Sequence, residues 1–309
     1  MNFTFSDLFA GIGGMRIAFE AVGGECILTC ENNDKAIKTY KHNFKANSSH
    51  IFHKDILTLV NEVKVPYHDV LLAGFPCQPY SIAGLRKGLK DVRGGEVFTS
   101  ILDILKKSKP AAFLLENVKN IKSHDNGKTF DYMISELEKS GYYTTNKILN
   151  SMEYANIPQN RERVFIVGFW KNTNFYFPKA PKTETRLGSI LQKRVKDKYT
   201  ISDKLWTSAI KRKERAISKG NGFSYKLFNR DSIYTSTLSA RYYKDGLEIL
   251  VEQKNKNPRR LTPLEARRLQ GFPDNFVIPV SDTQAYKQFG NAVPVNVVRE
   301  IAKNIVAYI

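Results

Sequence analysis

The sequence predicts an α/β fold: a doubly wound, mostly parallel sheet accompanied by a smaller basic lobe. Short apolar segments alternate with helical ones from residue 1 to about 175, which is typical of a parallel sheet. A glycine-rich turn follows the first predicted strand, where such folds commonly bind ligands. At 309 residues, the chain is long enough for one large core and a smaller lobe.

The first strand and the first helix are predicted at residues 3–9 and 15–22. Apolar and polar residues alternate in the strand, and Gly23-Gly24 closes the helix. The turn between them, Ala10-Gly11-Ile12-Gly13-Gly14, lets a ligand approach the backbone near a helix N-terminus. Arg16 stands where the dinucleotide fingerprint needs its third glycine, so the sequence does not support NAD binding.

Two further strands, predicted at residues 25–30 and 51–53, are each followed by an acid, Glu31 and Asp55. An acid at the end of the second strand is placed to bind ribose hydroxyls. Together with the glycine turn, these strand ends suit an adenosine-containing ligand. An ordinary doubly wound sheet with polar strand ends is the alternative interpretation.

The next two predicted strands, residues 70–73 and 111–115, precede the residues best suited to catalysis. A proline-braced loop after the first carries Cys77, and Glu116 ends the second. Carboxyl ends of parallel strands share one edge of a sheet, so this thiol and this acid can converge on one substrate. A cysteine nucleophile with an acid suits addition to an unsaturated ring. A buried apolar cysteine and a solvated glutamate are the alternatives.

The order of these and later motifs resembles the DNA cytosine-5 methyltransferases, which use S-adenosylmethionine. The resemblance implies the class I methyltransferase fold, duplex DNA as partner, and a target cytosine flipped out of the helix. The matching segments span some 290 residues: Asp7–Gly14, Glu31, Asp55, Gly74–Ser81, Glu116–Val118, Gln159–Arg163, Arg260–Pro273 and Gln288–Pro294.

The resemblance also implies a covalent mechanism. The Cys77 thiolate would add to C6 of cytosine; Cys26 and Cys30 lie within a predicted strand and are expected to be reduced core thiols. Glu116 would bond the N3 and exocyclic amine edge of the base. Arg163 would donate to the base O2, with Arg161 supporting the site.

Other segments receive roles from the same resemblance. Residues 81–95 look like a mobile active-site loop, in which Ser81 and Arg93 would bind phosphates; an ordinary surface loop is the alternative. Phe9 would pack on the adenine, Glu31 bind the ribose and Asp55 bind the adenine amine. The implied cofactor residues are Phe9, Gly11, Gly13, Gly14, Glu31, Asn32, Asp55, Ile56, Pro76 and Asn291. Many relatives carry an apolar or aromatic residue where Asn32 stands, which predicts weaker packing over the adenine.

Target recognition is assigned to the segment 234–250. It contains Thr237-Leu238, which resembles the Thr-Leu marker of the family's recognition domains. The stretch Leu238–Leu250 resembles the subgroup that methylates the inner cytosine of CCWGG, CCNGG or CCGG sites. A core strand pair with exposed cations is the alternative. The candidate DNA-binding residues here are Thr237, Arg241, Tyr242 and Lys244.

The positions of these motifs predict three functional segments. We expect a catalytic and cofactor-binding domain at 1–177, a small target-recognition domain at 178–275, and a C-terminal segment at 276–309 that returns to the catalytic domain. Half of the net charge of +18 lies between Lys179 and Lys219, where 13 Lys or Arg face four acids. This excess predicts an electrostatic footprint on DNA phosphates, with a solvated helix face as the alternative.

The composition of the chain restricts the cellular location of the protein and the kinds of partner it is expected to have. The sequence has no apolar run long enough to cross a membrane and no signal peptide, which predicts a cytoplasmic protein without a membrane partner. The cysteines lack the companions that a zinc site needs, so no metal is expected. We expect a monomer in a restriction-modification system, with a separately encoded endonuclease as companion. The alternatives are a tRNA cytosine-5 methyltransferase, a catalytically inactive DNA-binding relative and an NAD oxidoreductase.

Overall fold

A computed structural model of the chain describes residues 3–45, 49–76, 92–154, 157–180, 184–220 and 225–309. The chain divides into two compact units and crosses between them four times. Unit 1 comprises Met1–Leu149, Glu162–Lys179 and Val297–Ile309, and unit 2 comprises Asn150–Arg161 and Ala180–Asn296. Of the expected returning segment, therefore, Val297–Ile309 belongs to unit 1.

Unit 1 is built on a seven-stranded sheet of order β3-β2-β1-β4-β5-β7-β6. Neighbouring strands from β3 to β5 run parallel, whereas β7 is antiparallel to β5. The mostly parallel α/β sheet predicted from the sequence is confirmed. The strands are β1 (Phe3–Leu8), β2 (Gly24–Cys30), β3 (Ile51–His53), β4 (Val70–Gly74), β5 (Ala112–Val118), β6 (Tyr143–Asn150) and β7 (Glu162–Phe169).

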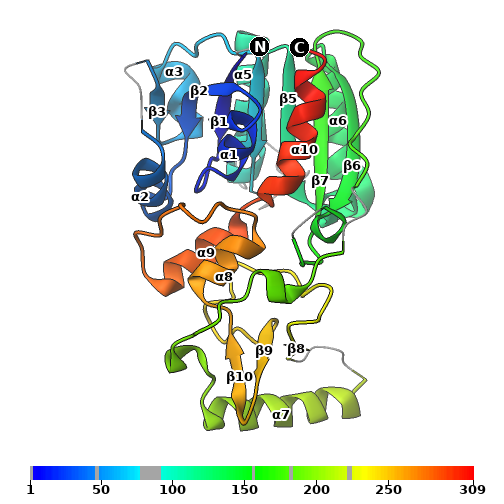
Figure 1. Ribbon diagram of the computed structural model, residues 1–309. Helices are drawn as coiled ribbons and strands as arrows, with labels where there is room; N and C mark the ends of the chain where they lie inside the picture. Colours follow the sequence, from blue (N-terminus) through cyan, green and yellow to red (C-terminus); the bar gives the residue numbers. More distant parts are fainter. Residues whose placement is uncertain (1–2, 46–48, 77–91, 155–156, 181–183, 221–224) are drawn as a thin grey trace. The chain divides into compact units, whose positions relative to one another are not determined.

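Helices cover both faces of this sheet (Figure 1). Residues of α3, α5 and α6 form one apolar cluster with inward side chains of the strands, such as Leu71 and Phe113. On the opposite face, Phe19 of α1 packs against Phe5 with ring centroids 5.7 Å apart. The helices are α1 (Gly14–Glu20), α2 (Asp34–Asn43), α3 (Ile56–Glu62), α5 (Val92–Ser108), α6 (Lys128–Lys139) and α10 (Val295–Val306).

The predicted boundaries of the first four strands are confirmed to within one residue. Glu116 differs from expectation: it lies inside β5, paired with Gly74 on one side and Phe165 on the other. The reason is that β7 continues the ladder through Val118, so the strand extends beyond its apolar run. The carboxylate therefore projects from within the strand and not from its end.

Unit 2 combines a three-stranded sheet of order β10-β9-β8 with helices α7, α8 and α9. It contains a buried ion pair: Arg259 Nη1 lies 2.7 Å from Glu265 Oε2, and Glu265 also completes the capping box of α8 with Thr262. The elements are α7 (Asp203–Ser218), β8 (Leu227–Phe228), β9 (Leu250–Gln253), β10 (Lys256–Arg260), α8 (Pro263–Leu269) and α9 (Asp282–Asn291).

Short 3₁₀ helices connect several of these elements: Lys119–Lys122, His124–Gly127, Ser151–Glu153, Leu187–Ser189 and Asp197–Tyr199. Among the described residues, no helix combines the length and the apolar character that crossing a membrane requires.

Candidate active site and DNA interface

The turn after β1 is shaped by left-handed backbone conformations. Gly11 and Gly13 have φ values of 57° and 83°, and Phe9 has φ 56°, which costs a non-glycine residue roughly 1–2 kcal/mol. A Cβ at Gly13 would lie 2.3 Å from the Phe44 ring, whereas one at Gly11 would have only the Phe9 carbonyl oxygen, 4.0 Å away, near it. Gly13 is thus required by packing, and Gly11 leaves open space beside the turn.

Glu31 is held at the end of β2 by two backbone donors. Its Oε2 accepts from Gly11 N at 2.7 Å, and its Oε1 accepts from Asn33 N at 2.7 Å. Each carboxylate oxygen keeps a second lone pair, so the group can still accept two hydroxyls, as a ribose would offer. The residues present therefore fit the ribose of a nucleoside cofactor next to the open side of Gly11.

The remaining predicted cofactor residues occupy varied positions. Asp55 is exposed and caps α3, accepting from Leu57 N at 3.0 Å. Phe9, Glu31 and Asp55 follow three neighbouring parallel strands, β1, β2 and β3. Gly14 and Ile56 are buried, Asn32 and Pro76 are exposed, and Asn291 is an exposed residue of unit 2. That these side chains bind the cofactor stays a prediction.

A buried polar network lies behind the glycine turn. Arg16 Nη1 donates to the Tyr40 hydroxyl at 3.0 Å, and that hydroxyl lies 2.7 Å from Thr29 Oγ1. Asp7 is 1% exposed, and burial raises its pKa to about 8, an effect that the Arg16 charge partly offsets. Arg16, which stands where the dinucleotide fingerprint has its third glycine, is therefore part of the buried hydrogen-bond network of the fold.

Cys77 and Ser81 lie outside the described residues, and Arg93 lies in α5 with its side chain outside the description. Burial raises the pKa values of Cys26 and Cys30 to about 12 each, so neither is a thiolate near neutral pH. Since the chain has three cysteines, exclusion of these two leaves Cys77 as the candidate nucleophile.

The backbone leading to Cys77 is tied to β5. Asn117 Nδ2 donates to the Phe75 carbonyl at 3.1 Å, and both residues are buried. Sequence reasoning assigned no role to Asn117. The available signal was an amide next to an acid in an otherwise apolar strand.

Glu116 and Arg163 form a largely buried ion pair across β5 and β7. Arg163 Nε lies 3.1 Å from Glu116 Oε1, and the side chains are 14% and 10% exposed, respectively. A Cβ built at Gly74 would lie 3.6 Å from Glu116 Oε2, so the end of β4 borders the carboxylate. The structure therefore brings together the acid and the arginine that were predicted to bind one base.

Arg161 has different surroundings. It belongs to unit 2, is 1% exposed, and donates to three backbone carbonyls, those of Leu238, Gly290 and Ala292. These contacts identify it as a structural residue of unit 2. That it supports the chemistry stays a prediction.

Two of the four predicted recognition residues are exposed cations: Arg241 and Lys244 lie in one turn, where Lys244 N donates to Arg241 O at 2.9 Å. Thr237 is half-buried, and its hydroxyl donates to Asn160 O at 2.6 Å. The prediction for Tyr242 is wrong. Its side chain is fully buried, and its hydroxyl donates to Ile249 O and accepts from Leu261 N, both at 2.7 Å.

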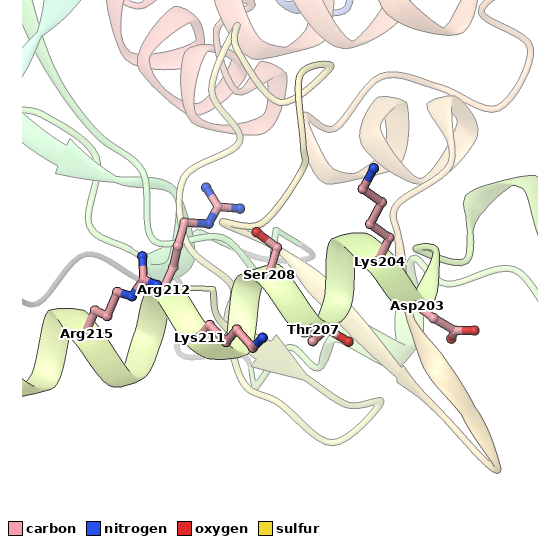
Figure 2. Close-up of a pocket in the computed structure, with 7 residues that line it drawn as sticks. All are labelled: Asp203, Lys204, Thr207, Ser208, Lys211, Arg212 and Arg215. Atoms are coloured by element: carbon pink, nitrogen blue, oxygen red, sulfur yellow. The ribbon is translucent and has the colours of Figure 1, made fainter.

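Helix α7 carries a basic groove on its surface (Figure 2). Its positions 204, 208, 211, 212 and 215 recur at helical spacing and are all exposed. Arg212 lies 3.8 Å from Asp245, and Lys213 instead packs 4.6 Å from the Tyr225 ring centroid. The groove is lined by Asp203, Lys204, Thr207, Ser208, Lys211, Arg212 and Arg215.

Comparison with known proteins gives consistent results. The chain is 49% identical over 309 residues to the Type II methyltransferase M.DsaV of Dactylococcopsis salina, covering 99% of this chain and 86% of that protein. It is 50% identical over 310 residues to the Type II methyltransferase M1.ScrFI of Lactococcus lactis subsp. cremoris, covering 98% and 78%. The crystal structure of the S. pombe Dnmt2 methyltransferase superposes with a TM-score of 0.80 at 20% identity, covering 99% of each chain, and shows the shared fold.

Residues 3–307 match the family described as C-5 cytosine-specific DNA methylase. The match spans both units, from β1 to the last helix. The chain therefore belongs to the C-5 cytosine-specific DNA methylase family and is a DNA (cytosine-5)-methyltransferase.

Proposed function

We propose that this protein methylates C5 of a flipped-out cytosine within a short duplex site through a covalent bond between Cys77 and C6. The observation that carries the proposal is the Glu116–Arg163 pair. Glu116 lies on β5, next to the strand β4 whose end leads to Cys77, and Arg163 lies on β7, on the other side of β5. Asn117 bonds the backbone that leads from β4 toward Cys77. Acid, arginine and nucleophile are thereby assigned to one edge of the sheet.

The proposed chemistry begins with activation of the ring. The Cys77 sulfur forms a bond to C6, and the displaced electron pair makes C5 nucleophilic while Glu116 and Arg163 bond the N3 edge and O2. S-adenosylmethionine, when bound, supplies an electrophilic methyl group to C5. A base then removes the C5 proton, and the C6–S bond breaks to release Cys77. Flipping the base costs a few kcal/mol of unstacking, which DNA contacts must offset.

The cofactor assignment rests on the turn after β1. Glu31 would accept the ribose hydroxyls, because its two oxygens are oriented by Gly11 N and Asn33 N. Phe9 and Asp55, at neighbouring strand ends, would contact the adenine ring and its amine. The open side of Gly11 admits the methionine part of the ligand.

DNA would be held by two kinds of contact in unit 2. The basic groove of α7 offers cations and hydroxyls for backbone phosphates, which provide affinity with little sequence choice. Arg241 and Lys244 are exposed in the recognition segment and are assigned to base edges. In unit 1, Ser81 and Arg93 are assigned to phosphates.

We place the enzyme in a restriction-modification system of the cytoplasm, because its relatives at 49–50% identity are named Type II methyltransferases. The target would be the inner cytosine of a CCWGG, CCNGG or CCGG site, as the recognition segment suggests. A monomer with a separately encoded endonuclease completes the proposal.

Two measurements test this function. Bisulfite sequencing of DNA from cells that express the protein should show 5-methylcytosine at the inner position of one such site. Duplexes with 5-fluorocytosine at that position should trap a covalent complex, because fluorine cannot leave as a cation, and the Cys77→Ser variant should trap none. Methylation of tRNA without duplex DNA would overturn the substrate, and turnover by the serine variant would overturn the covalent step.

A further inference from the structure

Gln159 and Arg161 together satisfy the backbone of Leu238, at the start of the recognition segment. Gln159 Oε1 accepts from Leu238 N at 2.8 Å, and Arg161 Nη1 donates to Leu238 O at 3.0 Å. Both side chains are buried, with at most 1% exposed. Because these groups are buried, water cannot replace a lost partner. A change that breaks either hydrogen bond therefore leaves a buried polar group unsatisfied.

The neighbouring backbone follows the same path. Thr235 N donates to Pro158 O, and Asn160 N donates to Thr235 O, both at 2.9 Å. The Thr237 hydroxyl adds a bond to Asn160 O at 2.6 Å. Residues 235–238 are thus held alongside 158–161 by backbone and side chain, although about 77 residues separate the two segments along the chain.

Arg161 also bonds the end of α9. Its Nη2 donates to Gly290 O at 2.9 Å and to Ala292 O at 2.8 Å. At Gly290 a Cβ would come within 2.4 Å of Ala240 N and Ser239 O, so α9 meets the recognition segment backbone to backbone. One planar guanidinium therefore joins two distant segments, a geometry that a lysine ammonium cannot reproduce.

We propose that Gln159 and Arg161 are positioning residues that determine target fidelity. By fixing Leu238, they hold the turn that carries Arg241 and Lys244 in one register against the bases. This rests on the proposed function, in which that turn reads the duplex. Loosening Leu238 would let mismatched sites be accommodated, because the reading side chains would no longer be held to one geometry.

The test compares methylation of the cognate duplex with a panel of single-mismatch duplexes. The readout is the ratio of kcat/KM for the cognate duplex to kcat/KM for each mismatched duplex. A lower fraction of folded or active enzyme reduces both values equally and leaves this ratio unchanged. In Arg161→Lys this ratio should fall about tenfold for at least one base position, the usual worth of one base contact. Gln159→Asn, a neutral and smaller change, should move the ratio in the same direction if the lysine variant does not fold.

Arg267→Lys is the matched control. Arg267 is also a buried arginine of unit 2, and its Nη1 donates to the carbonyls of Asp274 and Phe276, neither of which belongs to the recognition segment. It should lower the melting temperature without changing the ratio. An unchanged ratio in both test variants, or an equal change in the control, would overturn the proposal. Failure of the wild-type protein to methylate any duplex would instead overturn the proposed function.

Discussion

The Glu116 carboxylate and the Arg163 guanidinium lie 3.1 Å apart on paired strands of the candidate active site. In Glu116→Gln the side chain keeps its shape but loses its charge and its acid. Methyl transfer should slow by roughly two to four orders of magnitude, with modest loss of DNA affinity. Single-turnover transfer of a labelled methyl group, measured beside DNA binding, checks this. A parallel loss of rate and affinity would make Glu116 a structural residue.

Arg241 is exposed, so its removal should leave the fold intact. If it reads a base edge, Arg241→Ala should relax discrimination at one base position by about 1–3 kcal/mol. Methylation of single-mismatch duplexes, with a thermal melt as control, measures this. A phosphate contact would weaken binding to all sequences alike, and that outcome would remove Arg241 from base recognition.

At the scale of elements, helix α7 packs against the rest of unit 2 with one face and carries the basic groove on another. Ala209 is buried, and the Trp206 and Tyr225 ring centroids are 4.6 Å apart. Lys213 belongs to this attached side because it lies over Tyr225, and Arg212 lies near Asp245. The cations best placed to test phosphate binding are Lys204, Lys211 and Arg215.

Replacing Lys204, Lys211 and Arg215 by Gln should weaken binding to every duplex and make its salt dependence shallower. The log–log slope should decrease by about 0.9 for each lost phosphate contact. A matched control replaces three exposed lysines of unit 1, Lys38, Lys106 and Lys171, which changes the net charge equally. Equal slopes for the two triple variants would show that net charge alone acts and that α7 makes no direct contact.

At the scale of the whole molecule, the buried Asp7 links folding to pH. Burial raises its pKa to about 8 in the folded protein, Glu31 and Glu20 add to the rise, and Arg16 opposes it. The unfolded chain loses this proton near pH 4, whereas the folded protein keeps it. Stability from this group is therefore complete below about pH 4 and is lost as the pH rises toward 8.

Asp7→Asn removes this ionisation while keeping the shape of the side chain. The variant should have a flatter dependence of unfolding free energy on pH between about 4 and 8, and should exceed the wild type at pH 8 by roughly 5 kcal/mol at most. Urea denaturation without cofactor across this range checks it. Parallel curves for the two proteins would mean that folded Asp7 ionises in the ordinary range.

Local patterns in the sequence were sufficient for the first five strands of the sheet and suggested the chemistry. Hydrophobic alternation located β1, and the glycines marked the turn after it. Cys77 and Glu116 suggested addition to an unsaturated ring, and the ordered motifs indicated a family that the comparisons confirm. These features are read from the order of residues along the chain, so no knowledge of spatial contacts is needed.

Tertiary structure alone decided the contacts of individual side chains. Glu116 lies within β5 because β7, some 46 residues later, pairs beside it. Arg161 and Arg163 stand two positions apart in one motif, yet the first bonds carbonyls 77 to 131 residues away and the second pairs with Glu116. Tyr242 is buried although its neighbour Arg241 is exposed. The sequence by itself determined which elements and chemical groups are present. Partners remote in the chain determined which side chains are exposed, which are paired and which are buried in the fold, because burial and pairing are set only when distant segments pack together.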